Sequence, residues 1–303
     1  MTLQEKLIMK HWEINGRKDD ARIATLTPTP GIKEIRDLAY IEDGRRGHLL
    51  DIYYPDGTDQ PLPVLIGIHG GGFTYGYKEL NKLYYLYLSS LGFTVISLSY
   101  RLAPEIRFLS QVQDLSAAFH WIAENGADYP CDMENIFVTG DSAGGLFAML
   151  LPLLEQSPAL RDIFDIQPSG LPIRAIGLVS SAINMQRGAA LVLAEPTFGP
   201  GYRKLPEFLC LDMRTIPDLE KLPPCYMVTS AEDFVRGHSL EFAQILKERG
   251  IAHYQLHDWP KGKNRVLGHV FSVVFPTWEE SVITSKEMAN FFRKHSVTQT
   301  VNV

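Results

Sequence analysis

A serine in the setting of a nucleophile lies in the motif Gly-Asp-Ser-Ala-Gly-Gly at residues 140–145. The apolar run Ile136 to Val138 before it predicts a buried strand, and the apolar run over residues 146–151 predicts a buried helix. Glycines two positions to either side of Ser142 suit a turn so tight that larger side chains would clash. Such a turn, called a nucleophile elbow, exposes the hydroxyl for attack on an electrophilic carbon. Small residues also crowd ordinary strand-to-helix turns, so the motif needs support from elsewhere in the chain.

A second glycine-rich run, His-Gly-Gly-Gly-Phe at residues 69–73, follows the predicted strand Val64 to Ile68. Glycines let backbone N–H groups turn towards a ligand oxygen, and loops of this type supply the oxyanion hole of lipases and esterases. A third motif, Tyr-Arg-Leu-Ala-Pro-Glu, occupies residues 100–105. With three motifs in this order, the chain resembles the hormone-sensitive-lipase-like family of α/β-hydrolase carboxylesterases over about residues 48–295.

The resemblance implies a serine carboxylesterase that needs no cofactor. Ser142 would attack the ester carbonyl, and backbone N–H groups of Gly71, Gly72 and Ala143 would form the oxyanion hole. The resemblance also implies that His69 anchors the glycine loop by hydrogen bonds and is not the catalytic base.

The third motif has a structural role by the same resemblance. Pro104 would fix the backbone, while Arg101 or Glu105 would form buried ion pairs near the site. Asp114 also matches a family position without a catalytic role. The family usually carries an aspartate just before the tyrosine of this motif, where this chain has Ser99.

A serine nucleophile needs a base, which in this fold comes late in the chain and after the acid. His269 lies in a loop between the last predicted strand and the last predicted helix, where the fold presents its histidine. The family commonly has His-Gly-Phe here; this chain keeps Phe271 but has Val270 in place of the glycine. The other histidines after the elbow are more typical of packed or solvated positions: His238, His253, His257 and His295.

The acid is expected in the loop over residues 229–236, after the predicted strand Cys225 to Thr229. Asp233 matches the aspartate of the family, and Glu232 is the second candidate. Either carboxylate could instead serve only to favour the start of the following helix, where negative charge complements the helix dipole. The sequence alone does not decide which carboxylate is the catalytic acid and which only favours the helix start.

Strands and helices alternate along most of the chain, which predicts an α/β fold: a mostly parallel central sheet with helices on both faces, as in the α/β-hydrolase fold. Ligands of such sheets bind beyond the carboxyl ends of the strands. The strands are expected at 35–41, 49–54, 64–68, 93–98, 136–139, 173–179, 225–229 and 252–256, and the main helices at 78–91, 109–125, 143–155, 238–249 and 277–294.

Two segments depart from this alternation and are expected to cover the site as a small lid. Residues 1–31 include a short amphipathic helix, predicted over 1–16, and residues 181–222 are rich in proline, glycine and bulky apolar side chains. The whole chain, 1–303, is therefore predicted to form a single domain. Aromatic residues in segments near the site are candidates for substrate binding, although each could equally belong to the core: Phe73, Tyr75, Phe198, Tyr202 and Phe234.

Composition narrows the class of partner. A net charge of −6 over 303 residues, without a basic patch, argues against binding to nucleic acid. Charged residues interrupt the first 16 positions, unlike a secretory signal, and Ser, Thr and Gly interrupt the uncharged stretch 83–100, unlike a membrane span. Three cysteines without a metal-ligand spacing predict reduced thiols, no metal site and a cytoplasmic location.

Three functions remain for this machinery. The first is hydrolysis of small esters with short acyl chains. The second is amide or peptide hydrolysis by the same triad, and the third is a non-catalytic ligand-binding protein that keeps the fold. Intact Ser142 and His269 favour catalysis over the third. A homodimer through the open edge of the sheet is left open by the sequence.

Overall fold

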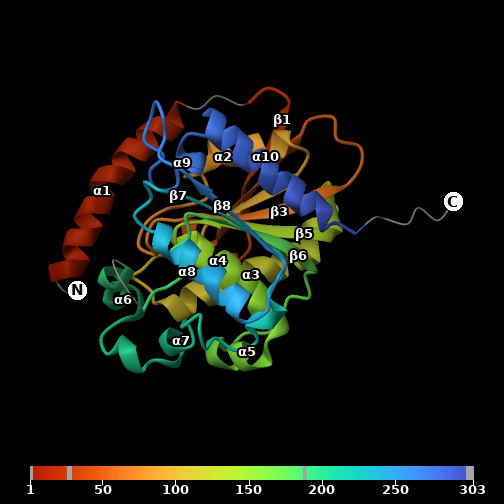
Figure 1. Ribbon diagram of the computed structural model, residues 1–303. Coiled ribbons are helices and arrows are strands. Elements are labelled where there is room, and N and C mark those ends of the chain that lie inside the picture. The colour runs from red at the N-terminus through yellow and green to blue at the C-terminus, as the bar shows by residue number, and fades with distance from the viewer. Residues whose placement is uncertain (1–2, 26–28, 187–189, 298–303) are drawn as a thin grey trace.

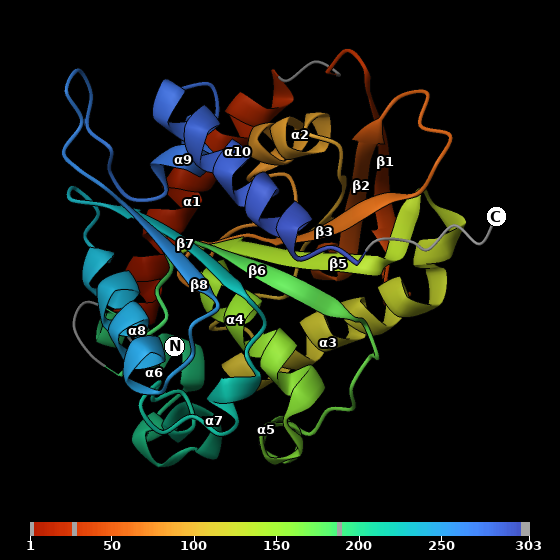
Figure 2. The same ribbon diagram turned by 45° about the vertical axis from the view of Figure 1, so that its right-hand side comes forward.

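The computed structural model describes residues 3–25, 29–186 and 190–297, and an eight-stranded sheet forms its centre (Figures 1 and 2). The order across the sheet is β1-β2-β4-β3-β5-β6-β7-β8. The pairs β1–β2 and β2–β4 are antiparallel, and the other pairs are parallel. The strands are β1 (Ile32–Ala39), β2 (Leu49–Pro55), β3 (Leu62–Ile68), β4 (Thr94–Leu98), β5 (Cys131–Asp141), β6 (Ile173–Val179), β7 (Cys225–Ser230) and β8 (Tyr254–Trp259).

Helices cover both faces of this sheet, which confirms the predicted α/β architecture. Figure 2 shows α2, α9 and α10 on one face and α3, α4, α5 and α8 on the other. The apolar runs of β3, β5 and β6 follow from this arrangement, because their side chains are buried on both sides. The helices are α2 (Lys82–Ser90), α3 (Phe108–Asn125), α4 (Ala143–Gln156), α5 (Pro158–Phe164), α8 (Arg236–Glu248), α9 (Phe271–Val274) and α10 (Glu279–Lys294).

The helices differ from the sequence-based expectation at several places. The N-terminal helix α1 (Leu3–Ala24) is longer than the predicted 1–16, and hydrogen bonds from Tyr75 and Tyr77 to its second half account for the extension. The helix expected from residue 78 begins at Lys82. Two short helices, α5 and α9, were not predicted, since four to seven residues give little periodicity to read.

The segment 181–222 contains α6 (Leu191–Phe198) and α7 (Pro206–Leu209), joined by short helical turns. In Figure 1, α1 runs along the flank of the molecule, with α6 and α7 beneath its first turns. Trp12, Asp19 and Arg22 of α1 and Leu193 of α6 line the same cavity. Among the described helices, none is long and apolar enough to cross a membrane.

Candidate active site

Ser142 lies at the turn between β5 and α4, in a backbone conformation that few residues adopt. Its φ is 50° and its ψ is −117°. A Cβ atom on Gly140 would lie 2.2 Å from the carbonyl oxygen of Gly144, and one on Gly144 would lie 2.2 Å from that of Ile68. Both contacts are with backbone and cannot be relieved by a rotamer change. The glycines at 140 and 144 are therefore steric requirements of the elbow.

His269 connects Ser142 and Asp233. Its Nε2 lies 2.9 Å from Ser142 Oγ, and its Nδ1 lies 2.8 Å from Asp233 Oδ1. The serine follows β5, the aspartate follows β7 and the histidine precedes α9, so the three side chains meet beyond the carboxyl ends of the strands. With Nδ1–H donated to the carboxylate, Nε2 is free to accept the serine proton.

Asp233 is buried and surrounded by donors. Its Oδ1 also accepts the backbone N–H of Val235, and its Oδ2 accepts the hydroxyl of Thr229. Burial opposes ionisation, but the hydrogen bond and charge of His269, together with hydrogen bonds from Val235 and Ser180, outweigh it, so the pKa of Asp233 is lowered. The carboxylate is thus held in its charged form beside the imidazole.

Glu232 has a different place. Its Oε2 accepts the backbone N–H groups of Gly262 and Leu267, and these two hydrogen bonds lower the pKa of Glu232. It therefore braces the loop that leads to His269. The other histidines after Ser142 form hydrogen bonds with different partners: His238 with Asn184, His253 with Leu222, His257 with Glu287 and His295 with Phe291.

The glycine loop lies against the elbow. Gly71, Gly72 and Ala143 line the same cavity as Ser142. Gly71 and Gly72 have φ values of 111° and 59°, and a Cβ on Gly71 would lie 2.1 Å from the carbonyl oxygen of Tyr75. Only glycine fits that position, which is the reason for the run that the sequence displays.

Two buried side chains hold the start of this loop. Asp141 Oδ1 accepts the N–H of Gly70 at 3.0 Å and the amide of Asn81 at 2.6 Å. Burial raises the pKa of Asp141 to about 6 despite these donors. His69 donates from Nδ1 to the carbonyl of Gly70 at 2.7 Å, and burial lowers its pKa to about 4, so the ring is neutral.

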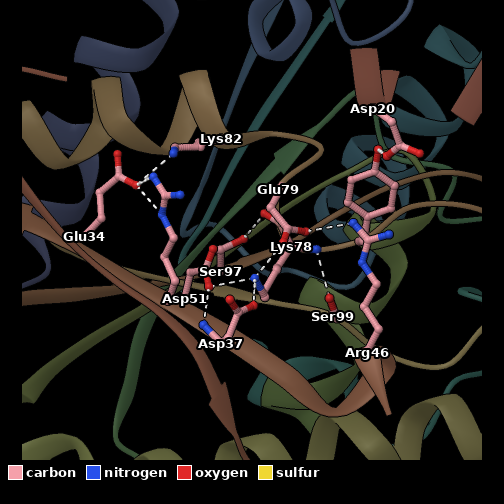
Figure 3. A network of polar contacts seen from close by, with 12 residues as sticks. Asp20, Glu34, Asp37, Arg46, Asp51, Lys78, Glu79, Lys82, Ser97 and Ser99 are labelled. Atoms are coloured by element: carbon pink, nitrogen blue, oxygen red, sulfur yellow. Dashed lines mark hydrogen bonds and ion pairs between the residues drawn. The ribbon is translucent and has the colours of Figure 1, made fainter. Parts of the chain in front are cut away.

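A network of charged groups holds the end of the loop (Figure 3). The ammonium of Lys78, which is 1% exposed, lies 2.7 Å from Asp37, 2.8 Å from Asp51 and 2.6 Å from Glu79. The backbone N–H of Lys78 donates to Ser99 Oγ at 2.9 Å. This hydrogen bond gives Ser99, which replaces the aspartate of the family, a defined role.

The network continues to α1. Arg46 contacts Glu79 at 3.4 Å and lies 3.9 Å from the ring centre of Tyr77, whose hydroxyl donates to Asp20 at 2.7 Å. Sequence reasoning missed this network, because its members are spread from residue 20 to residue 99 and form no motif. The expected buried pair of the third motif is formed by Arg101 with Asp114, while Glu105 is exposed.

The cavity above Ser142 has a volume of about 560 Å³ and a largely apolar lining. Of the predicted substrate-binding residues, Phe73, Tyr75 and Phe234 line it, and the Phe234 ring lies 4.3 Å from that of His269. Phe198 and Tyr202 do not, because both pack against Phe208 in the core of the 181–222 segment. Lining residues that sequence reasoning missed include Trp12, Leu80, Leu83, Met185, Leu193, Val270, Val273 and Phe275.

The described residues contain no cluster of His, Cys, Asp or Glu side chains arranged to hold a metal ion. Cys131, Cys210 and Cys225 are buried and unpaired. Burial raises the pKa of the Cys131 and Cys210 thiols to about 12, which makes them unreactive at neutral pH.

Comparison with known proteins gives consistent results. A family model described as BD-FAE matches residues 50–170. The chain is similar to carboxylesterase NlhH of Mycobacterium tuberculosis, 28% identical over 271 residues, covering 84% of this chain and 81% of NlhH. It is also similar to esterase LipI of the same organism, 28% identical over 248 residues, covering 76% and 75% of the two chains.

A solved structure extends the similarity over almost the whole chain. Inhibited esterase B from Lactobacillus rhamnosis superimposes with a TM-score of 0.88 at 26% identity, covering 97% of this chain and 96% of that one. The chain thus has the α/β-hydrolase fold of these carboxylesterases, to which it is similar over most of its length, and is a carboxylic ester hydrolase.

Proposed function

We propose that the ester is cleaved by a catalytic triad of Ser142, His269 and Asp233. The observation that carries this proposal is the unbroken chain of contacts from Ser142 Oγ through His269 to Asp233, at 2.9 and 2.8 Å. In this arrangement the histidine can take the proton of the serine, and the carboxylate can hold and stabilise the imidazole.

The reaction would proceed in two halves. His269 removes the proton of Ser142 as its oxygen attacks the ester carbonyl, and Asp233 stabilises the imidazolium that forms. His269 then gives this proton to the leaving alcohol, which departs and leaves an acyl-enzyme. In the second half, His269 takes a proton from water as the water oxygen attacks the acyl carbon. His269 then returns this proton to Ser142 Oγ as the acyl–oxygen bond breaks and the carboxylic acid departs.

The oxyanion would be bound by backbone N–H groups of Gly71, Gly72 and Ala143. Support comes from the glycine loop itself, since the N–H of Gly70 already donates to Asp141 and is committed there. The two glycines that follow line the cavity beside Ser142. A donor of this kind contributes about 2.7–4 kcal/mol to stabilisation of the transition state.

The substrates would be small esters with acyl chains of about two to six carbons, because each added methylene gains about 0.8 kcal/mol only while the cavity has room for it. A cover held by specific contacts supports this preference. Trp12 of α1 donates to Thr74 and stacks on Tyr75, and Tyr75 donates to Asp19. Leu193 of α6 closes over Gly72.

We further propose that residues 1–303 form one domain, with residues 1–31 and 181–222 as its cover, because both buried cores pack on the same sheet. The unpaired cysteines are consistent with a cytoplasmic location. A homodimer stays a prediction.

Replacing Ser142 by alanine tests the mechanism. The variant should fold normally but lose turnover of p-nitrophenyl butyrate, because the hydroxyl is the nucleophile. A serine-directed phosphonate should label wild-type protein once, at Ser142, as read by mass spectrometry of peptides. Wild-type rates in the alanine variant, or a label on another residue, would exclude this mechanism.

A further inference from the structure

Val270, the residue after His269, has a left-handed backbone. Its φ is 52° and its ψ is 30°. This region is unfavourable for all residues with a Cβ, and most of all for β-branched side chains such as valine. Glycine adopts it without a steric penalty. A valine here therefore carries a cost that some other property of the side chain must offset.

The backbone of Val270 has reasons for this conformation that do not involve its side chain. Its N–H donates to Ser180 Oγ at 3.1 Å, while its carbonyl accepts the N–H groups of Val273 and Val274. The chain thereby turns into α9 immediately after presenting His269 to Ser142. A glycine would permit the same hydrogen bonds, so backbone geometry explains the positive φ and leaves the valine unexplained.

Val270 lines the cavity above Ser142. It belongs to one wall, defined here as the α2–α9 wall, formed by Leu80, Leu83, Val270, Val273, Val274 and Phe275. Val270 is the member of this wall that adjoins His269 in the chain, and it is also packed against the core beneath α9 and α10. Packing therefore holds in place the side chain of the cavity-lining residue that follows His269.

We propose that Val270 determines specificity by limiting the bulk of the ester group that lies along the α2–α9 wall. This inference rests on the proposed function, since it requires that Ser142 and His269 perform the chemistry. A side chain that packs against the core has little freedom to move away from a larger substrate. Strained residues often persist at sites where the side chain is used.

Two substitutions separate the volume of the side chain from the strain of its backbone. Val270→Ala removes two methyl groups and keeps a Cβ at the left-handed position. Val270→Gly removes the same groups and the strain. Since one methylene in an apolar pocket changes selectivity by about 10–200-fold, each variant should shift preference towards the bulkier substrate by about tenfold or more.

The assay compares kcat/KM within two pairs of esters. In one pair the acyl group changes, from p-nitrophenyl butyrate to p-nitrophenyl cyclohexanecarboxylate. In the other pair the alcohol changes, from ethyl butyrate to cyclohexyl butyrate. A shift in the first ratio assigns the wall to the acyl group, and a shift in the second assigns it to the alcohol. Active sites are counted by phosphonate titration, and urea unfolding monitors stability.

Val266→Ala is the matched control, because it makes the same deletion in the same loop at a side chain that is 65% exposed. Its ratios should equal those of the wild type. Both ratios unchanged within about twofold in both Val270 variants would overturn the proposal, as would a shift in the glycine variant alone, which would indicate backbone strain. Ser142→Ala is assayed alongside: wild-type rates there would contradict the proposed function, whereas an inactive Ser142→Ala variant together with unchanged Val270 ratios would contradict the role of Val270 alone.

Discussion

Replacing Asp233 by asparagine removes the charge beside His269 with almost no change in shape. Asp233 Oδ1 receives both His269 Nδ1–H and the backbone N–H of Val235, so the amide of the variant should keep its oxygen at this position. The imidazole then retains its orientation and tautomer. What disappears is the attraction between the carboxylate and the imidazolium that forms during the reaction.

The size of this loss follows from the geometry. Unit charges about 2.8 Å apart, at an effective dielectric constant of about 20, attract each other by about 6 kcal/mol. At about 1.36 kcal/mol per factor of ten, kcat should fall by about four orders of magnitude. A loss of about 10⁴ is also known for the equivalent change in a serine protease, where it comes from the wrong histidine tautomer. KM should change little, because Asp233 does not line the cavity.

Glu232→Gln provides the matched control. The neighbouring carboxylate undergoes the same chemical change, and the glutamine oxygen can still accept from Gly262 and Leu267. Its kcat for p-nitrophenyl butyrate at pH 8 should stay within about tenfold of the wild type. If Asp233→Asn keeps more than a tenth of wild-type kcat, or if Glu232→Gln is the inactive variant, the assignment of the acid is wrong.

Three further changes test other parts of the site. Gly71→Ala should lower kcat by about 10²–10³ with little change in KM, because its Cβ would displace an oxyanion donor, whereas Gly237→Ala, with open space around it, should be silent. The raised pKa of Asp141 makes its protonated form stabilising at low pH, and this contribution is lost as the pH rises through about 6. In urea unfolding, the free energy of unfolding of Asp141→Asn relative to that of the wild type should therefore rise by about 2 kcal/mol from pH 4 to pH 7.5. Along p-nitrophenyl esters from acetate to laurate, kcat/KM should peak at or below about six carbons, and a maximum at eight or more would show that the cover opens.

Local steric rules explain why much of the catalytic centre could be predicted. At the elbow and in the glycine loop, a Cβ atom on Gly140, Gly144 or Gly71 would lie 2.1–2.2 Å from a backbone oxygen, so glycine is required. Such requirements are visible as motifs of a few consecutive residues. The buried strands β3, β5 and β6 are similarly visible as continuous apolar runs. His269 and Asp233 needed the resemblance to a family, because only the folded sheet brings them to Ser142.

The parts that could not be predicted depend on contacts between distant residues. Asp141 and Gly70 are 71 positions apart, and nothing local in either segment indicates their hydrogen bond. The aromatic residues show the same limit. Phe198 and Tyr202 are predicted to line the pocket because of their residue type, but the structure packs both against Phe208. Whether a side chain lines the cavity or the core is decided by the path of residues 181–222, which no periodic pattern specifies.

Two buried carboxylates close to Ser142 have pKa values shifted in opposite directions, and their partners explain why. Asp233 contacts His269, which in the proposed mechanism becomes positively charged during the reaction, so the negative charge of Asp233 is favoured. Asp141 accepts hydrogen bonds from the neutral Gly70 N–H and Asn81 amide, and burial outweighs these bonds and the charge of His269. If Asp141 ionises above pH 6, Gly70 N–H and the Asn81 amide bind that charge. In the proposed mechanism, the N–H groups of Gly71 and Gly72, which line the cavity, then serve the charge that the reaction creates.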